Sequence, residues 1–410
     1  MILCVLGSAC DTTKGTTGRN LTALFAEPGE NNIRVTYDVN HLQDGRTRVK
    51  WELDPNSLEL DESMGTTMSL VFRYQIFYNY STLTAVDSGS IILKEIACKK
   101  DRKALGEFYL NIVKDRNHLL EVTLRDLNSL RNDQQYIDIV KANRFSEQSY
   151  LMFDSDGIEI TADFVTKADS YFIEPFVQVD KLWMRFYSRD FPTASPPFAI
   201  VNPKPFDFNP DRKVRLKANE NGQFKAIIDK EGFYQFITDS ASQSGGTVYF
   251  FADHYPEAKT VNGLMMPLRY ITTTQEFEEL TQSQNLKKSV DAYWLKIGGN
   301  PDRARMLIQS YYSRVERANQ LFSSYLEGWK SDRGMCYIVF GPPTKVVRST
   351  SAETWYYGEA GKYNTLTLTF TKVTNPFSNN DFRLNRNGSL KSPWYRAVEF
   401  WRQGRVITYQ

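Results

Sequence analysis

The spacing of hydrophobic residues changes about two-thirds of the way along the chain. From residue 32 to about residue 271, apolar and polar residues mostly alternate, as in segments 33–37, 49–53 and 182–187. Alternation gives a strand one apolar face, so these segments predict β-strands. We predict further strands at residues 68–80, 90–96, 107–113, 118–124, 213–218, 223–228, 233–237 and 247–251. Since no long helix separates them, they predict two antiparallel, immunoglobulin-like β-sandwiches, over residues 31–148 and 149–271.

One dipeptide in the second predicted sandwich carries a strong turn signal. Asn221-Gly222 lies between two of the predicted strands. Both residues tolerate a positive φ angle, which the tight turn of a β-hairpin requires. The sequence therefore predicts that segments 213–218 and 223–228 pair with each other.

From Thr273 the spacing becomes that of helices. Thr273 and Glu276 fit a capping box, and we predict short helices at residues 276–281 and 285–297. Asn300 can cap the next helix and Pro301 suits its first position, so a long helix is predicted over residues 301–327. Its apolar residues recur about one turn apart and form an aromatic stripe, namely Ile308, Tyr311, Tyr312, Val315, Ala318, Phe322 and Tyr325. The arginines at 303, 305, 314 and 317 are expected on its solvent side.

The last part of the chain mixes helix and strand signals. Gly328 is expected to end the long helix, and the apolar run 335–340 is predicted as a strand. Further strands are predicted at residues 353–357, 365–372 and 405–409, and a short helix at 395–402. The fold class is therefore mostly β, with residues 272–410 forming an α+β domain in which helices pack on a small sheet.

A set of motifs in this last region resembles a known family. Residues 328–334 read Gly-Trp-Lys-Ser-Asp-Arg-Gly, the apolar run ends at Phe340-Gly341-Pro342-Pro343, and residues 353–357 read Glu-Thr-Trp-Tyr-Tyr. These residues resemble the GWxTD domain family, which is found mainly in envelope proteins of Bacteroidota. Ser331 stands where the family name has Thr, but its hydroxyl can still form a capping bond. The resemblance implies a class of protein but no established chemistry. The signature residues are Gly328, Trp329, Ser331, Asp332, Arg333, Gly334, Gly341, Pro342 and Pro343.

Two interpretations of the signature loop are open. In the structural one, Trp329 is buried between helix and sheet, Asp332 accepts hydrogen bonds from backbone N–H groups, and Arg333 pairs with a carboxylate such as Glu353. In the other, Asp332 and Arg333 bind a polar ligand, or Asp332 acts as an acid with a lowered pKa. We favour the structural interpretation.

The N-terminus resembles the end of a bacterial lipoprotein signal. The apolar residues 1–9 end in Leu6-Gly7-Ser8-Ala9, and Cys10 follows as the expected acylated residue. No basic residue precedes the apolar run, so we expect the true start codon upstream; a short buried strand is the alternative. Residues 11–30 begin with a Thr- and Gly-rich stretch and are predicted to be a flexible tether that precedes the two sandwiches. No later run is long enough to span a bilayer.

Composition limits the possible chemistry. The 410 residues include 50 Lys and Arg against 48 Asp and Glu. The resulting net charge of +2 is too small to attract nucleic acid. The three histidines lie far apart, and the motifs of P-loops, dinucleotide-binding folds and serine hydrolases are absent from the sequence. We therefore predict no catalytic residue, no metal and no cofactor. Cys98 and Cys336 are expected to be two separate thiols rather than a disulfide.

These observations predict a non-enzymatic envelope lipoprotein. We expect it on the inner leaflet of the outer membrane, facing the periplasm, where it acts as a structural or protein-interaction component, for example in secretion or outer-membrane assembly. Its expected partners are the membrane, through the lipid, and other envelope proteins. One alternative is a carbohydrate- or peptide-binding module with exposed rings such as Trp183 or Trp394. Another is an uncharacterised hydrolase centred on Asp332, which requires an open pocket at the signature loop.

Overall fold

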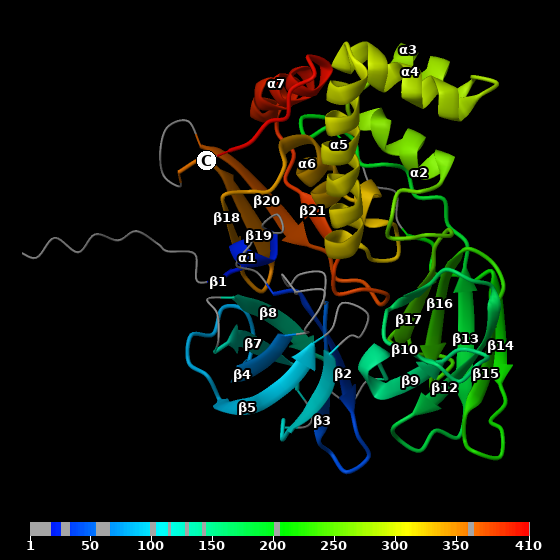
Figure 1. Cartoon of the computed structure of the whole chain (residues 1–410). Coiled ribbons are helices and arrows are strands. Elements are labelled where there is room, and N and C mark those ends of the chain that lie inside the picture. Colours follow the sequence, from blue (N-terminus) through cyan, green and yellow to red (C-terminus); the bar gives the residue numbers. More distant parts are fainter. Residues whose placement is uncertain are drawn as a thin grey trace, which may run out of the picture.

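The computed structural model describes most of the chain. The described residues are 18–25, 33–54, 66–98, 104–113, 116–127, 131–141, 145–200, 206–359 and 365–409, and the side chains of 66–68 and 94–98 are outside this description. The predicted lipoprotein signal with Cys10 therefore lies outside the described residues, as does the side chain of Cys98. Figure 1 shows two β-sheet bodies side by side, with a helix-rich C-terminal unit above them.

The first body is a two-layer β-sandwich, as the alternating pattern predicts. One sheet has the order β2-β3-β6 and the other β5-β4-β7-β8. Between them lies a core that includes Val49, Trp51, Phe72 and Val122, all at most 2% exposed. The strands are β2 (Val35–His41), β3 (Thr47–Leu53), β4 (Thr66–Phe77), β5 (Asp87–Cys98), β6 (Ala104–Leu110), β7 (His118–Asp126) and β8 (Asn132–Ile139).

The second body is another two-layer sandwich. Its sheets have the orders β10-β9-β12-β15 and β11-β17-β16-β13-β14, and both contribute to one core. A short 3₁₀ helix, η2 (Glu147–Ser149), precedes it. The strands are β9 (Tyr150–Phe153), β10 (Glu159–Ile160), β11 (Phe164–Val165), β12 (Asp169–Pro175), β13 (Leu182–Tyr187), β14 (Arg212–Leu216), β15 (Phe224–Ile228), β16 (Gly232–Ile237) and β17 (Gly246–Phe250). That either sandwich has immunoglobulin topology stays a prediction.

The predicted hairpin at Asn221-Gly222 is wrong at the level of the sheet. The tight turn exists, with Gly222 at φ +79° and the Asn219 N–H donating to the Gln223 carbonyl at 2.8 Å. However, β14 and β15 belong to different sheets of the sandwich, joined here only by an isolated bridge between Ala218 and Phe224. The turn signal describes local geometry, whereas sheet membership depends on which face of each strand is buried.

The C-terminal unit is α+β, as predicted, and it contains a five-stranded antiparallel sheet. The sheet order is β1-β18-β19-β20-β21. The strands are β1 (Arg19–Asn20), β18 (Lys345–Arg348), β19 (Ala352–Tyr357), β20 (Leu366–Lys372) and β21 (Phe382–Leu384). The helices are α1 (Thr22–Phe25), α2 (Val261–Met265), η3 (Met266–Tyr270), α3 (Thr274–Thr281), α4 (Leu286–Gly298), α5 (Pro301–Phe322), η4 (Gly328–Lys330), α6 (Asp332–Phe340), η5 (Gly388–Leu390) and α7 (Lys391–Arg402). Helix α3 begins with the predicted capping box of Thr273 and Glu276.

Three predictions about this unit are wrong. The apolar run 335–340 is not a strand but most of helix α6, because a fully buried helix has no polar face to reveal its period. Helix α5 ends at Phe322 and not at residue 327, and Gly328 begins a separate 3₁₀ turn. Residues 405–409 form no strand.

Arg314 also departs from its predicted place on the wet side of the long helix. It is 3% exposed, its Nη2 donates to the Ile407 carbonyl at 2.9 Å, and its guanidinium lies over the Trp401 ring at 5.2 Å. Because these contacts replace water for a charged group, an arginine can occupy the buried stripe of a helix.

The sequence predicted that residues 18–25 belong to a free tether. They are instead docked onto the C-terminal unit. Strand β1 pairs with β18 at the edge of the C-terminal sheet, and Leu21 and Phe25 are 3% and 1% exposed in its core. The Phe25 ring packs edge-on against Trp355 with centroids 5.2 Å apart. The chain therefore first joins the C-terminal unit and only then enters the first sandwich.

Each sandwich is docked onto the C-terminal unit. On the second, an aromatic cluster bridges the outer face of the sheet with β16 and β17 to the C-terminal loops, and it contains Tyr187, Phe233, Tyr249, Phe251, Tyr255 and Phe377. On the first, Phe77, Tyr80 and Leu119 belong to the core of the C-terminal unit. Within the part of the chain that the structure describes, no helix has the length and apolar character to cross a bilayer.

Candidate functional site

Two glycines of the signature loop permit an unusually close contact between helices. A Cβ atom on Gly328 would lie 2.1 Å from the Ala318 carbonyl oxygen in α5. A Cβ on Gly334, in α6, would lie 2.0 Å from the carbonyl oxygen of Gly328. Real Cβ atoms cannot approach backbone so closely, so only glycine fits at these two positions. The signature glycines therefore set the distance between α5, η4 and α6.

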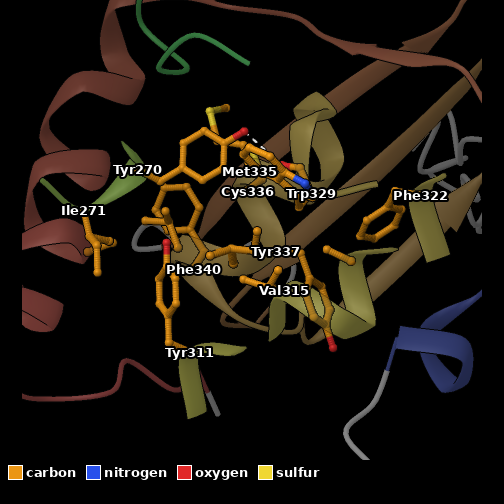
Figure 2. Close-up of a cluster of buried hydrophobic side chains, with 14 of the residues drawn as sticks. Tyr270, Ile271, Tyr311, Val315, Phe322, Trp329, Met335, Cys336, Tyr337 and Phe340 are labelled. Carbon is orange, nitrogen blue, oxygen red and sulfur yellow. Dashed lines mark hydrogen bonds between the residues drawn. The ribbon is translucent and has the colours of Figure 1, made fainter. Parts of the chain in front are cut away.

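Trp329 is buried in the core of the C-terminal unit, with 4% of its surface exposed. Its backbone N–H donates to Asn319 Oδ1 at 3.0 Å, and its carbonyl accepts a bond of 2.9 Å from the Tyr270 hydroxyl. Figure 2 shows the indole among Tyr270, Met335 and Cys336. The predicted burial of this ring between helix and sheet is therefore present, although Trp329 lies on η4 and does not extend the α5 stripe.

Ser331 and Asp332 begin helix α6. Ser331 Oγ accepts the Gly334 N–H at 3.0 Å and donates to the Gly328 carbonyl at 2.7 Å, so the predicted capping bond is present. Asp332 Oδ2 accepts the Leu384 N–H at 2.8 Å and Arg386 Nη1 at 2.9 Å, while Oδ1 accepts from Arg386 Nη2. Both carboxylate oxygens are thus engaged, in a two-pronged pair with one arginine.

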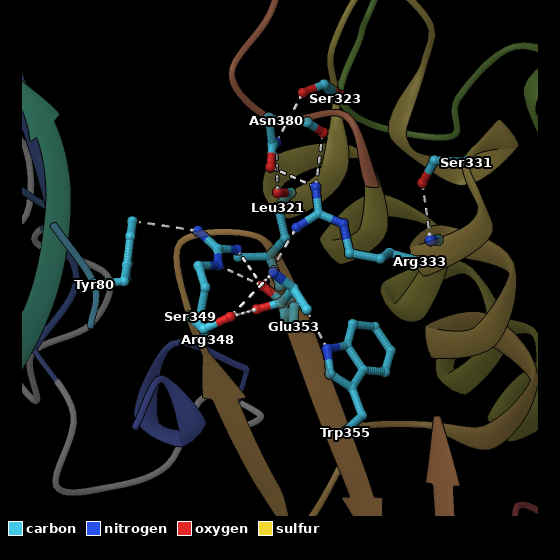
Figure 3. Close-up of polar contacts among 12 residues, drawn as sticks. Tyr80, Leu321, Ser323, Ser331, Arg333, Arg348, Ser349, Glu353, Trp355 and Asn380 are labelled. Carbon is cyan, nitrogen blue, oxygen red and sulfur yellow. Dashed lines mark hydrogen bonds and ion pairs between the residues drawn. The ribbon is translucent and has the colours of Figure 1, made fainter. Parts of the chain in front are cut away.

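Arg333 belongs to a buried charge network that Figure 3 shows. Its Nη1 lies 3.6 Å from Glu353 Oε2, which is the ion pair that the sequence suggested. Glu353 Oε2 also accepts from Arg348 Nε at 2.5 Å, and Oε1 accepts from Trp355 Nε1 at 2.7 Å. Glu353 is fully buried and Arg333 is 1% exposed, so one carboxylate joins two arginines inside the protein.

The opposite charges of Glu353 and the two arginines stabilise one another inside the protein. Burial raises the pKa of Glu353, but Arg348 and Arg333 outweigh it and the pKa is lower than usual. Burial lowers the pKa of Arg333 to about 10, with Glu353 acting against that effect. The Arg333 guanidinium also stacks on Phe322 and Phe382, at 4.9 and 4.3 Å from their ring centres. The three groups therefore remain ionised at neutral pH.

The network reaches both the end of helix α5 and the first sandwich. Arg333 Nη2 donates to the Asn380 carbonyl at 2.8 Å, and the Asn380 amide donates to the carbonyls of Leu321 and Ser323 at 3.0 and 2.9 Å. These carbonyls lack helical partners, because α5 ends there. On the other side, Arg348 Nη1 donates to the Tyr80 hydroxyl at 3.4 Å.

The second half of the motif closes helix α6. Gly341 has φ +84°, which glycine adopts readily, and its carbonyl accepts a bond of 3.0 Å from the Tyr357 hydroxyl. Pro342 and Pro343 follow and cannot continue the helix, and Pro343 is buried. The signature residues from 328 to 343 thus form one continuous structure: a 3₁₀ turn, a capped helix and its exit.

Sequence reasoning missed several partners of this structure. Arg386, Asn380 and Tyr255 lie 47 or more residues from the groups they bind across the fold, and in loops without any pattern. Arg348 could have been found, because it sits directly opposite Glu353 in the β18–β19 register. That register was not deducible before the strand limits were known.

The geometry offers little for catalysis at the loop. Burial raises the pKa of the Cys336 thiol well above its usual value, so this cysteine stays protonated. Among the residues that the structure describes, core side chains fill the space beside Trp329, where a hydrolase at Asp332 requires an open hollow. The predicted exposure of Trp394 for sugar stacking is wrong, because this ring is only 4% exposed and packs on Phe340. Trp183 is half-buried with Lys213 Nζ 5.1 Å from its ring centre.

Comparison with known families places this loop in context. Residues 232–403 match the family model of the GWxTD domain. The chain contains a GWxTD domain over these residues. The matched region begins at β16 in the second sandwich and ends after α7, so it includes both sides of the aromatic cluster that docks this sandwich. No curated protein matches the chain.

Proposed function

We propose that this GWxTD protein is a non-enzymatic envelope lipoprotein, a structural or protein-interaction component that serves secretion or outer-membrane assembly. The observation that carries the proposal is the inward direction of its signature residues. Trp329 and Arg333 are buried, and both oxygens of Asp332 are occupied by protein groups. Because its side chains face inward, the motif determines how the elements of the fold are arranged. Protein partners would then be bound by the outer surfaces.

The connections between the three bodies support this proposal. Arg348 links the signature network to Tyr80 of the first sandwich, and the Tyr249 hydroxyl donates to the Phe377 carbonyl at 2.6 Å across the contact with the second. Contacts of this kind hold docking surfaces on different bodies in a fixed relation, which suits a protein that aligns partners.

The anchor of the proposed lipoprotein is Cys10. Since Gly18 already lies beside Arg348 at the sheet edge, the chain takes only eight residue-to-residue steps from Cys10 to the C-terminal unit. At about 3.5 Å per residue they span at most about 28 Å. We propose that the GWxTD domain therefore lies near the membrane, on the periplasmic side of the outer membrane, whereas the sequence alone suggested that the sandwiches would come first.

Metabolic labelling tests the anchor. Cells that express the gene from its own locus are grown with radioactive palmitate. The wild-type protein and the Cys4→Ala control should become labelled, and Cys10→Ala should not. The Cys10→Ala protein should also leave the membrane fraction, because acyl chains bind membranes through buried methylenes. Continued membrane retention of Cys10→Ala would count against the lipid anchor.

Crosslinking in cells tests the interaction role. Wild type, Cys10→Ala and Asp332→Asn are crosslinked in intact cells and purified from membranes. A scaffold should retain the same protein partners in Asp332→Asn, provided the variant folds, because Asp332 does not face a ligand. Loss of an enzymatic product in Asp332→Asn with unchanged partners would instead support the hydrolase alternative.

A further inference from the structure

The connection between strands β13 and β14 is far longer than their pairing requires. The two strands are antiparallel neighbours, with Phe186 opposite Arg212. Strands paired in this way are usually joined by about two to five residues. Here the 24 residues from 188 to 211 join them, and the described residues of this connection form no helix or strand. Irregular connections longer than about 12–15 residues are uncommon in a compact domain unless they have a function.

The two ends of this connection are held together at the second sandwich. Arg189 donates from Nη1 to Asp211 Oδ2 at 2.6 Å and from Nη2 to the Asn209 carbonyl at 2.5 Å. The rings of Phe191 and Phe206 stack with their centres 6.3 Å apart. A loop whose ends are joined in this way keeps its attachment to its own domain, whatever the middle of the loop contacts.

The middle of the connection lies on the C-terminal unit, and we call residues 192–199 the tip. The Ala194 N–H donates to the Lys330 carbonyl of η4 at 3.0 Å. The Ser195 carbonyl accepts a bond of 3.1 Å from Arg386 Nη2. The tip thus binds this unit through its own backbone, which is how an extended peptide binds a receptor.

An aromatic contact adds to these backbone bonds. The Phe198 ring packs on the Tyr395 ring of α7, with the two centres 5.4 Å apart, and Pro197 is buried beside it in the sequence. Tyr395 still keeps 54% of its surface exposed. We call the three residues that receive the tip the tip-binding surface, namely Lys330, Arg386 and Tyr395.

The tip has the composition of a preorganised ligand. Pro192, Pro196 and Pro197 each fix their own φ angle and favour an extended conformation in the residue before them. Such a segment has little conformational freedom to lose when it binds, and aromatic surfaces often recognise proline-rich segments for this reason.

The simplest explanation is that the tip is a permanent part of the fold. Two observations argue against it. The family match covers residues 232–403, so the tip-binding surface belongs to the GWxTD domain whereas the tip does not. The surface is also held in place without the tip, because buried Trp329 fixes η4 and buried Trp394 fixes α7. Directly after the tip, Ile200 is 97% exposed, so the packing onto this unit ends there.

We propose that the tip-binding surface receives an extended Pro-Pro-aromatic segment of a partner protein, and that the tip occupies this surface until the partner displaces it. The inference rests on the interaction role proposed above and gives that role a surface and a partner chemistry. A tip that is anchored at its base and held by few residues at its end is suited to open without unfolding either domain.

Fluorescence anisotropy with a labelled peptide of residues 190–200 tests the proposal on the purified full chain. In a tip-replaced variant, an equally long Gly-Ser segment takes the place of residues 192–199. This variant should bind the peptide, and wild type should bind it at least about tenfold more weakly, because the tip must leave first. A peptide that carries Pro197→Gly and Phe198→Ala should not bind. Because the assay uses purified protein, its failure leaves standing any partner that crosslinking finds in cells at another surface.

A matched pair of tyrosines tests the location. In the tip-replaced variant, Tyr395→Ala should weaken binding by about five- to thirtyfold, the effect of removing an aromatic anchor. Tyr78→Ala removes a ring of similar exposure, 46%, on the first sandwich and should leave binding unchanged. The proposal is overturned if the folded tip-replaced variant binds no peptide up to millimolar concentration, or if the altered peptide binds equally well. Equal effects of the two tyrosine substitutions would also overturn it.

Two measurements on wild type test the tip if the tip-replaced variant does not fold. Hydrogen–deuterium exchange should be faster in the tip than in α6, because the tip opens while the C-terminal unit stays folded. Exchange in the tip as slow as in α6 would show a permanent part of the fold and overturn the proposal. Light scattering should find a monomer. A dimer joined by exchange of the tips would show that the surface takes the tip of a second copy, which also overturns the proposal of a foreign partner.

Discussion

The Glu353→Gln substitution removes one charge from the buried network with almost no change in side-chain size. Glu353 is fully buried, and its carboxylate receives hydrogen bonds from Arg348 at Oε2 and from Trp355 at Oε1. A glutamine can present its oxygen to only one of these donors. If the oxygen stays near Trp355, the amide NH₂ group faces the guanidinium of Arg348, and if it turns, the Trp355 N–H loses its partner. In either orientation Arg333 and Arg348 lose the carboxylate charge that they share.

The expected loss of stability is about 3–5 kcal/mol, the range for breaking a buried ion pair by removing one partner. Since a folded domain is stable by only about 5–15 kcal/mol, this is a large fraction of the total. Urea unfolding followed by tryptophan fluorescence measures it. Glu278→Gln, an exposed residue in α3, is the matched control and should change the unfolding free energy by no more than about 0.5 kcal/mol.

The same variant makes a prediction about pH. The pKa of folded Glu353 is lowered below its ordinary value of 4.5 by Arg348 and Arg333, which outweigh burial. Its contribution to stability is therefore complete above pH 4.5 and is lost as the pH falls through the folded pKa. The stability gap between wild type and Glu353→Gln should be constant at neutral pH and should shrink below pH 4.5. A gap as small as that of Glu278→Gln at pH 7 would refute the reasoning about the network.

Three further predictions follow from the packing. Gly328→Ala should cost several kcal/mol or prevent folding, because its Cβ would lie 2.1 Å from the Ala318 carbonyl; Gly388→Ala, where a Cβ meets nothing within 4 Å, should be close to neutral in the same urea assay. Cys336 should resist iodoacetamide at pH 8 in the native protein and react only in urea, as peptide mass mapping will show, since its thiol is buried and its pKa is raised; rapid native labelling would contradict this. Phe377→Ala should cost about 3–5 kcal/mol and increase protease cleavage between the second sandwich and the C-terminal unit, because the ring is 5% exposed in the aromatic cluster; unchanged cleavage would contradict the docking role.

Local signals in the sequence predicted local structure well. The capping box of Thr273 and Glu276 and the start of α5 at Asn300-Pro301 are both present, because these signals act within one helical turn. Strand β13 has the predicted limits of 182 and 187, since its alternating pattern corresponds to one buried face. The sequence also suggests Glu353 as a carboxylate partner of Arg333, and the two side chains form an ion pair.

Failures arose where burial or pairing depends on distant residues. Helix α6 was predicted as a strand because all six residues from 335 to 340 are buried, which removes the periodic signal. Arg314 was placed in water because charge alone does not reveal that Trp401 and the Ile407 carbonyl are there to receive it. The docking of residues 18–25 could not be predicted, because their partner strand β18 lies more than 300 residues later in the chain.

Hydrogen–deuterium exchange of helix α6, compared between wild type and Trp329→Ala, tests most directly whether the signature loop locks the fold. If Trp329 holds α6 against α5 and the sheet, peptides covering Asp332–Phe340 should be among the slowest to exchange in wild type. In Trp329→Ala they should exchange much faster, together with the β18–β19 peptides. Fast exchange of α6 in wild type, or exchange that Trp329→Ala leaves unchanged, would contradict the structural role.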